Sequence, residues 1–147
     1  MRVIVLDGIK RLEYRGYDSA GLAAIKSDGA YYCKKVRGRV DALFGLADQN
    51  IDSFLCIAHS RWATHGEPSV ENAHPHFDCK KEIFLVHNGI IENHSQLKAK
   101  LLKKGHKFRS GTDTETVVHM IEELIKKPSV TFEEAVRQTL SLIKGTY

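Results

Sequence analysis

The chain has 147 residues, of which 42% are hydrophobic and 27% charged. This length and apolar content fit one globular domain and exclude wholesale disorder or a collagen-like repeat. No apolar run approaches the roughly 18 residues of a membrane span, and Asp7 interrupts the apolar start too early for a signal peptide. We therefore expect a cytoplasmic protein that does not associate with membranes.

The charge and cysteine content argue against two further classes. The net charge of +4 raises the question of nucleic-acid binding. However, the one basic stretch, from Lys98 to Arg109, is interleaved with leucines, a pattern more typical of a solvated helix face than of a phosphate-binding track. Cys33, Cys56 and Cys79 are odd in number and lack C-x-x-C spacing, which disfavours a disulfide framework or a zinc ribbon.

Hydrophobic periodicity and turn residues predict the first half of the chain as a helix, a β-hairpin, a short helix and a core strand. Asp28-Gly29 is a strong hairpin signal, and Gly16 is a plausible end for the first helix. The expected ranges are Val3–Glu13 (helix), Gly21–Lys26 and Ala30–Lys35 (hairpin), Val40–Gln49 (helix) and Phe54–Trp62 (strand).

The second half is predicted to hold one more core strand followed by three helices. A long loop containing proline and histidines leads to the strand, and Gly145 opens what looks like the entry to another strand. Thr131 and Glu134 have the spacing of a capping box. The expected ranges are Ile83–Ile91 (strand), Ser95–Lys104, Thr114–Lys126 and Thr131–Lys144 (helices). Strands grouped between helices indicate an α+β fold.

The densest polar constellation runs from His59 to Gly66, where a predicted strand leaves for a loop. The guanidinium fork of Arg61 suits a carboxylate, and Thr64 and His65 add donors beside it. The alternative is a surface arginine in an ion pair, with Trp62 as core packing.

Histidines at 65, 74, 76 and 87 could converge on a metal ion. Their spacing matches no zinc pattern, and no acidic partner is obviously placed. Satisfied loop histidines are the better interpretation, so we expect no metal and no cofactor.

Two further segments each have a structural and a functional interpretation. Asn88-Gly89 is either a two-residue hairpin turn or an oxyanion hole that uses the Asn amide and the Gly N–H. Before the helix at Thr114, either Thr112 and Glu115 form a capping box or Asp113 is the cap. Asp113 could also bind a ligand ammonium group, and both roles could hold for different residues.

Five motifs in order give the chain a resemblance to a known family. They are Leu12-Glu13-Tyr14-Arg15-Gly16-Tyr17-Asp18-Ser19-Ala20-Gly21, Arg61-Trp62-Ala63-Thr64-His65-Gly66, Asn72-Ala73-His74-Pro75-His76, His87-Asn88-Gly89-Ile90-Ile91-Glu92-Asn93 and Thr112-Asp113-Thr114-Glu115. Together they strongly resemble the glutaminase domain of the glutamine–fructose-6-phosphate aminotransferase family, a branch of the class II glutamine amidotransferases. The resemblance spans essentially the whole chain.

The resemblance implies an N-terminal-nucleophile hydrolase fold, a four-layer αββα sandwich, with L-glutamine as the substrate. Family members attack the glutamine amide with an N-terminal Cys and pass ammonia to a sugar-phosphate isomerase domain that uses fructose 6-phosphate. The roles carried over are α-carboxylate binding for Arg61, Thr64 and His65, a tunnel wall for Trp62, α-ammonium binding for Asp113, an oxyanion hole for Asn88 and Gly89, and an active-site position without a defined role for Arg15.

The sequence departs from the family at the nucleophile. In the family, Cys-Gly-Ile follows the initiator Met and opens a central strand, whereas Met1-Arg2 here falls inside the helix that comes later. We therefore expect a partial glutamine amidotransferase domain over 1–147, truncated at both ends, without the isomerase domain and inactive alone. A complementing fragment or a homodimer could complete it. The alternatives are a non-catalytic amino-acid-binding or regulatory module, and a metal or nucleic-acid binder.

Overall fold

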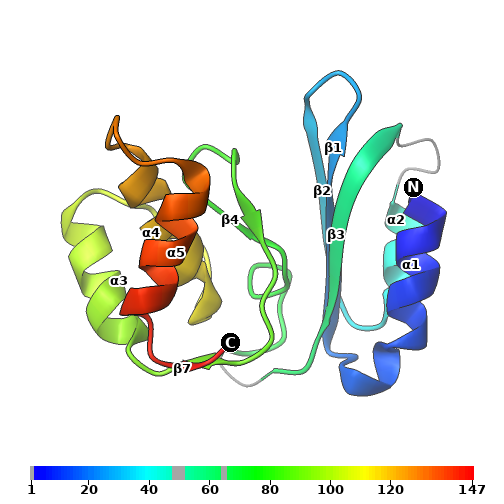
Figure 1. The fold of residues 1–147 in the computed structure, drawn as a ribbon. Helices are drawn as coiled ribbons and strands as arrows, with labels where there is room; N and C mark the ends of the chain where they lie inside the picture. The colour runs from blue at the N-terminus through cyan, green and yellow to red at the C-terminus, as the bar shows by residue number, and fades with distance from the viewer. Residues whose placement is uncertain (1, 48–51, 64–65) are drawn as a thin grey trace. The chain divides into compact units, whose positions relative to one another are not determined.

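The computed structural model describes residues 2–47, 52–63 and 66–147, and the chain divides into two compact units, Met1–Pro75 and His76–Tyr147 (Figure 1). Each unit has its own apolar core. None of the described helices is both long enough and apolar enough to cross a membrane.

The first unit is an antiparallel three-stranded sheet covered on one face by two helices (Figure 1). The strand order is β2-β1-β3, and the predicted β1–β2 hairpin is confirmed. The elements are α1 (Arg2–Arg11), the 3-10 turn η1 (Glu13–Arg15), β1 (Ser19–Lys26), β2 (Tyr31–Arg37), α2 (Val40–Leu46) and β3 (Ser53–Arg61). Helix α1 ends two residues before the predicted Glu13, and Asp48 and Gln49, predicted to extend α2, lie outside the described residues.

Strand register separates two faces of this sheet. Leu22 pairs with Ala58, and Ala20 pairs with Val36. Because directly opposed residues share a face, these side chains form one apolar layer, which packs with Leu6 of α1 and Leu43 of α2. The alternate positions, Gly21 and His59, therefore lie on the opposite face, along with Arg61.

Strand β3 was expected to be buried, and this is wrong for its first half. Phe54 is 69% exposed and Leu55 is 54% exposed. The reason is position: β3 is the last strand in the order β2-β1-β3, so among the described residues it pairs only with β1. An apolar run predicts a strand, but it does not tell a central strand from an edge strand.

The second unit consists of three helices with two small two-stranded sheets. The helices and the final strand lie close to their predicted ranges. The elements are β4 (His76–Phe77), β5 (Phe84–Leu85), β6 (Ile90–Ile91), α3 (His94–Lys103), α4 (Thr114–Ile125), α5 (Phe132–Leu142) and β7 (Gly145–Thr146).

The single strand predicted over Ile83–Ile91 is wrong. It is two short strands in different sheets, since β5 pairs with β4 and β6 pairs with β7. The segment between them carries Asn88 and Gly89 in a loop. The hairpin interpretation of Asn88-Gly89 is therefore also wrong, because the strands on its two sides do not pair with each other.

Helix α4 is the centre of the second unit. Its residues from Thr114 to Glu122 are all buried, and Val118 and Ile121 pack in a core with Ile91 and Ala135. The Thr131 half of the predicted capping box of helix α5 is confirmed, because Thr131 Oγ1 accepts the Glu134 N–H at 3.2 Å. A central buried helix gives the groups at its beginning a fixed position.

Candidate functional site

Arg61 is the last residue of β3 and is 4% exposed. Its Nη2 donates to the Gly66 carbonyl at 3.0 Å, and its Nη1 lies 3.9 Å from Asp18 Oδ1. A buried guanidinium is stable only with anionic or hydrogen-bonding partners. Arg61 is therefore not a surface residue, but the ion pair of that interpretation is present, with Asp18 as the partner.

Asp18 organises the backbone around Arg61. Its Oδ2 accepts the Ala63 N–H and its Oδ1 accepts the Ser19 hydroxyl at 2.8 Å, while its own N–H donates to the Arg61 carbonyl at 3.1 Å. Asp18 belongs to the first of the five sequence motifs, which does not by itself predict a role for it. Its place in that motif was the only signal, because its partners Arg61 and Ala63 are more than forty positions away.

Gly16 lets the segment after η1 pass directly over the end of β3. A Cβ atom at this position would lie 2.6 Å from the Arg61 carbonyl carbon and 2.8 Å from the Trp62 nitrogen. Gly16 was predicted only as the end of a helix, and the close approach of the two backbones also requires a glycine here.

Trp62 is 60% exposed, so its interpretation as core packing is wrong. Its ring meets Tyr17 edge-on, with centroids 5.6 Å apart. Arg15 is exposed on η1. Thr64 and His65 lie outside the described residues, so the structure leaves their predicted roles untested.

Gly89 lies where only a glycine fits. Its φ is +148°, and a Cβ atom there would overlap the Thr146 carbonyl oxygen of β7. Beside it, His87 Nδ1 lies 3.1 Å from Thr114 Oγ1 at the start of α4. The Asn88-Gly89 loop is thus fixed between β7 and the first turn of α4.

Asp113 is the N-cap of α4, which confirms one of the two capping interpretations. Its Oδ1 accepts the Thr114 N–H at 2.9 Å, and its Oδ2 accepts the Ile91 N–H at 2.6 Å. Oδ1 also accepts a 3.4 Å contact from the Thr114 hydroxyl, whereas the second lone pair of Oδ2 is compatible with an ammonium ligand.

The Thr112–Glu115 capping box is wrong. The Glu115 carboxylate accepts the N–H groups of Arg109 and Ser110 at 2.8 and 2.7 Å, and Thr112 Oγ1 contacts His76 Nε2 at 2.9 Å. Burial alone would raise the pKa of Glu115, but hydrogen bonds from His119, Ser110 and these amides outweigh it and bring the pKa to about 2.

The histidines suspected of binding a metal have other partners. His74 stacks on His59 with centroids 4.3 Å apart. His76 contacts Thr112 and His87 contacts Thr114, and His65 lies outside the described residues. These contacts agree with the interpretation of satisfied loop histidines for His74, His76 and His87.

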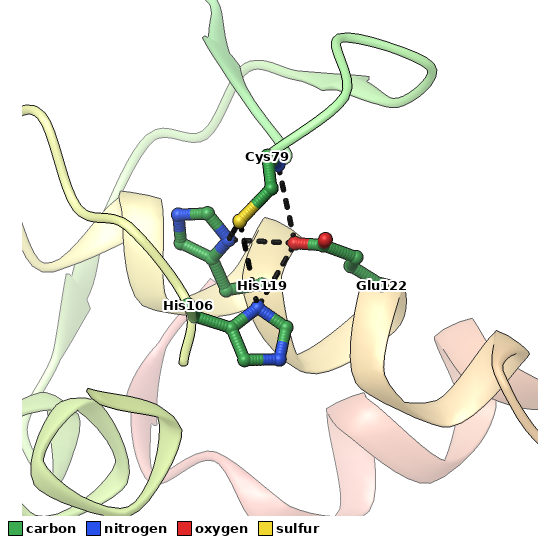
Figure 2. Close-up of side chains that lie close together, drawn as sticks. All are labelled: Cys79, His106, His119 and Glu122. Carbon is green, nitrogen blue, oxygen red and sulfur yellow. Dashed lines mark hydrogen bonds and ion pairs between the residues drawn. The ribbon is translucent and has the colours of Figure 1, made fainter. Parts of the chain in front are cut away.

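Within the described part of the chain, a different group has the composition and spacing of a metal site. We name it the Cys79 cluster: Cys79, His106, His119 and Glu122, whose ligand atoms all lie within 4.8 Å of one another (Figure 2). Cys79 follows β4, His106 follows α3, and the other two lie on α4. This cluster was not predicted from the sequence, although His119 and Glu122 have the i, i+3 spacing that places both on one helix face.

Solved structures of other proteins share the fold of this chain. The chain superposes on a glutamine phosphoribosylpyrophosphate amidotransferase from B. subtilis with a TM-score of 0.78 and 28% identity, covering 95% of this chain and 30% of that one. A second solved structure, an allosteric regulatory enzyme of purine biosynthesis, gives 0.80 and 30% identity over 98% of this chain and 31% of that one. The fold is therefore the α+β fold of the N-terminal-nucleophile amidotransferases, as predicted.

Sequence similarity shows which protein family the chain belongs to. Residues 44–131 match the glutamine amidotransferase domain family. Relatives named glutamine–fructose-6-phosphate aminotransferase (isomerizing) are 49% identical in Pyrococcus horikoshii and 50% identical in Thermococcus kodakarensis, each over 98% of this chain. The chain spans 24% of the length of each of these relatives. The chain belongs to the glutamine amidotransferase domain family.

Proposed function

We propose that this chain binds L-glutamine as the glutaminase part of an enzyme that transfers the amide nitrogen to fructose 6-phosphate, forming glucosamine 6-phosphate for amino-sugar synthesis. The observation that carries the proposal is the identity of 49–50% to relatives with that name over 98% of the chain. The absence of any disulfide among the cysteines in the described residues supports a reducing compartment such as the cytoplasm.

The roles of individual residues follow the family resemblance, and the local geometry supports several of them. Arg61 would hold the glutamine α-carboxylate, with Thr64 and His65 beside it and Trp62 as an adjacent wall. Burial and fixation by Gly66 and Asp18 give its guanidinium the rigid placement that such a contact needs. Arg15 belongs to the same active-site motif without a defined role.

In the second unit, Asp113 would bind the α-ammonium group, and Asn88 and Gly89 would stabilise the oxyanion that develops on the amide carbonyl. An oxyanion hole depends on donors that are already in place before the reaction. The fit of Gly89 against Thr146 supports this role, since it fixes the position of the loop backbone.

We further propose that the nucleophile is none of the three cysteines in residues 1–147. Cys33 lies in the middle of β2. Burial raises the pKa of the Cys56 thiol on β3, which disfavours the reactive thiolate, and Cys79 belongs to the cluster around α4. Residues 1–147 taken alone should therefore bind glutamine without hydrolysing it.

Calorimetric titration of the 147-residue protein with L-glutamine tests the binding role. Arg61→Gln should weaken binding about 10- to 100-fold, because a charge-assisted hydrogen bond contributes roughly 1.5–3 kcal/mol. The matched control is Arg137→Gln, an exposed arginine that pairs with Glu134 on α5, and it should leave the affinity unchanged. Absence of glutamine binding by a folded wild type would refute the proposal.

Glutamate release, measured in the same samples, tests the catalytic part separately. We expect no release above a protein-free blank. Turnover that disappears in Arg61→Gln would show that a cysteine of this segment does act as the nucleophile.

A further inference from the structure

We propose that the Cys79 cluster is a structural zinc site, with Cys79 Sγ, Nδ1 of His106, Nδ1 of His119 and Glu122 Oε2 as its four ligands. One thiolate, two imidazoles and one carboxylate are donors that Zn²⁺ uses in proteins, and four protein ligands are typical of its structural sites. The proposal is independent of the glutamine-binding role.

The distances between the ligand atoms suit a tetrahedral ion. Sγ lies 3.8 Å from His119 Nδ1 and 3.9 Å from His106 Nδ1, and Oε2 lies 2.9 and 3.0 Å from the same two nitrogens. Zinc–ligand bonds of about 2.0–2.3 Å at tetrahedral angles give edges of roughly 3.3–3.6 Å. Shifts of about half an ångström would bring these four separations to that geometry, and the other two pairs of ligand atoms lie within 4.8 Å of each other.

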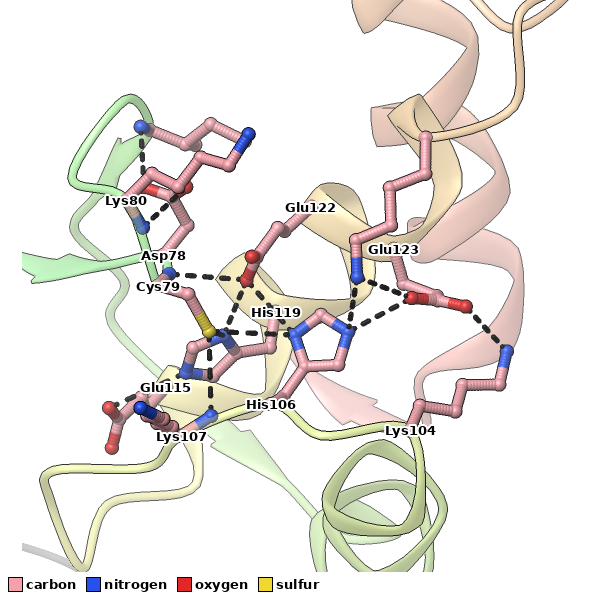
Figure 3. Close-up of polar contacts among 12 residues, drawn as sticks. Asp78, Cys79, Lys80, Lys104, His106, Lys107, Glu115, His119, Glu122 and Glu123 are labelled. Carbon is pink, nitrogen blue, oxygen red and sulfur yellow. Dashed lines mark hydrogen bonds and ion pairs between the residues drawn. The ribbon is translucent and has the colours of Figure 1, made fainter.

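Both imidazoles turn the same nitrogen toward the centre, while their outer nitrogens face carboxylates (Figure 3). His106 Nε2 lies 3.0 Å from Glu123 Oε2, and His119 Nε2 lies 3.6 Å from Glu115 Oε1. A carboxylate behind each metal-ligating histidine fixes the ring orientation and raises the basicity of the ligand. His106 has this contact at hydrogen-bonding distance, with Lys126 Nζ also 3.2 Å from the same nitrogen. The His119 contact is an ion-pair distance, longer than a hydrogen bond.

The charges within the cluster also favour a divalent cation. One thiolate and one carboxylate neutralise Zn²⁺, so the occupied site carries no net charge in a place where His106 and His119 are 4% and 0% exposed. The Lys107 N–H donates to Sγ at 3.4 Å, a contact that stabilises a thiolate. The thiolate selects zinc-like ions over Mg²⁺ or Ca²⁺, which prefer oxygen ligands.

A metal at this position would join three segments that lie far apart in the sequence. It would tie the loop after β4 and the segment after α3 to the middle of α4 (Figure 2). No ligand position remains for a substrate, so the ion would stabilise the second unit and would not act in catalysis.

Metal binding can be measured directly on the whole 147-residue protein. After treatment with a chelator and removal of the chelator, titration with Zn²⁺ should show one ion per chain. Titration with Co²⁺ should give a thiolate-to-cobalt charge-transfer band together with the intense d–d absorption of tetrahedral cobalt. Mg²⁺ should produce neither signal nor competition.

Three variants test whether Zn²⁺ binding and the Co²⁺ bands come from the Cys79 cluster. Cys79→Ser should lose the charge-transfer band and bind Zn²⁺ at least about 100-fold more weakly, whereas the matched control Cys56→Ser, also a half-buried cysteine, should bind as wild type does. Glu123→Gln keeps all four ligands and should weaken binding about 10-fold through His106 alone.

The wild-type spectra keep the proposal falsifiable even if Cys79→Ser does not fold. Folded wild type that binds no Zn²⁺, or binds Co²⁺ without a thiolate band, would overturn it. Equal loss of the band in Cys56→Ser and Cys79→Ser would also overturn it, because the thiolate would then not be assigned to the cluster.

Discussion

At the scale of single residues, Asp113 combines a structural role with a proposed binding role. Its two oxygens accept N–H groups from Thr114 and Ile91, so the carboxylate joins the start of α4 to β6. Such contacts fix its orientation, which is what recognition of an ammonium group requires. They also mean that substitutions of Asp113 change stability as well as binding.

Asp113→Ala should lower the free energy of unfolding by about 2–4 kcal/mol. The lost helix cap accounts for about 1 kcal/mol, and the buried Ile91 N–H left without an acceptor accounts for about 1–3 kcal/mol. Urea denaturation at neutral pH measures the difference. The control is Asp41→Ala, an exposed acid in the first turn of α2, which should change stability by no more than about 0.5 kcal/mol. A loss in Asp113→Ala equal to the control's would contradict this account of the cap.

Glu13, in the first of the family motifs, has a structural role that is sensitive to pH. Its Oε2 accepts from Lys10 Nζ at 2.8 Å and its Oε1 accepts the Val40 N–H at 2.8 Å, where α2 begins. The Lys10 hydrogen bond, aided by the Val40 amide, lowers the pKa of Glu13 below 4.5. A carboxyl group whose pKa is lower in the folded state stabilises the fold above its unfolded pKa, and this stabilisation is lost as the pH falls through the folded pKa.

Glu13→Gln therefore gives a pH test. The amide keeps an acceptor for Val40 but removes the charge, so wild type should be the more stable protein at neutral pH, by no more than about 1 kcal/mol for a partly exposed pair. Below pH 4.5, the unfolded-state value for Glu13, the two stabilities should converge. Urea midpoints measured across this range check the trend. A difference that stays constant with pH would show that the Glu13 charge does not contribute.

At the scale of elements, Gly89 links the proposed oxyanion loop to β7. Gly89→Ala should lower the free energy of unfolding by about 1–3 kcal/mol. A Cβ atom would overlap the Thr146 carbonyl oxygen, and the φ of +148° is unfavourable for alanine. Gly8→Ala is the matched control: Gly8 lies in α1 with no atom near its Cβ position, so alanine should stabilise by about 0.5–1 kcal/mol. Thermal denaturation compares the two, and destabilisation by both variants would rule out the steric explanation.

The elements that the sequence predicted well are those whose signal is local. The β1–β2 hairpin, the three C-terminal helices and the strand at Gly145 depend on turn residues, caps and periodicity within short windows. The strand predicted over Ile83–Ile91 failed because its apolar pattern runs through Asn88-Gly89, while the partners of β5 and β6 lie on different segments. Strand pairing is a non-local property, so an apolar run does not reveal where one strand ends and another begins.

The same contrast applies to the candidate sites. Motifs identified Arg61, Asn88, Gly89 and Asp113 as residues of interest. They did not reveal that Arg61 is buried with Asp18 and Gly66 as its partners, which the periodicity does not connect to it. The Cys79 cluster draws on three segments separated by 27 and 13 positions. Only the His119–Glu122 pair could be recognised from the sequence, and a single i, i+3 pair is common on solvated helix faces.

At the scale of the whole molecule, the two units have separate apolar cores. The core of Met1–Pro75 includes Leu6 and Leu43, and that of His76–Tyr147 includes Val118 and Ile121. The ligands of the proposed zinc site all belong to the second unit. Each core contributes its own local stability, so the effect of a ligand can be followed separately in α4 and in β1.

Zinc should therefore protect α4 selectively from hydrogen exchange. A ligand that binds only the folded state stabilises it by about 2.7 kcal/mol at a free concentration 100 times its Kd, which corresponds to roughly 100-fold slower exchange where opening breaks the site. Peptides covering Thr114–Ile125 should show this slowing when Zn²⁺ replaces a chelator, whereas peptides of β1 should change much less. In Cys79→Ser the slowing in α4 should disappear. Equal slowing of α4 and β1 in wild type would show that zinc acts on the molecule as a whole, and slowing that persists in Cys79→Ser would place the ion elsewhere.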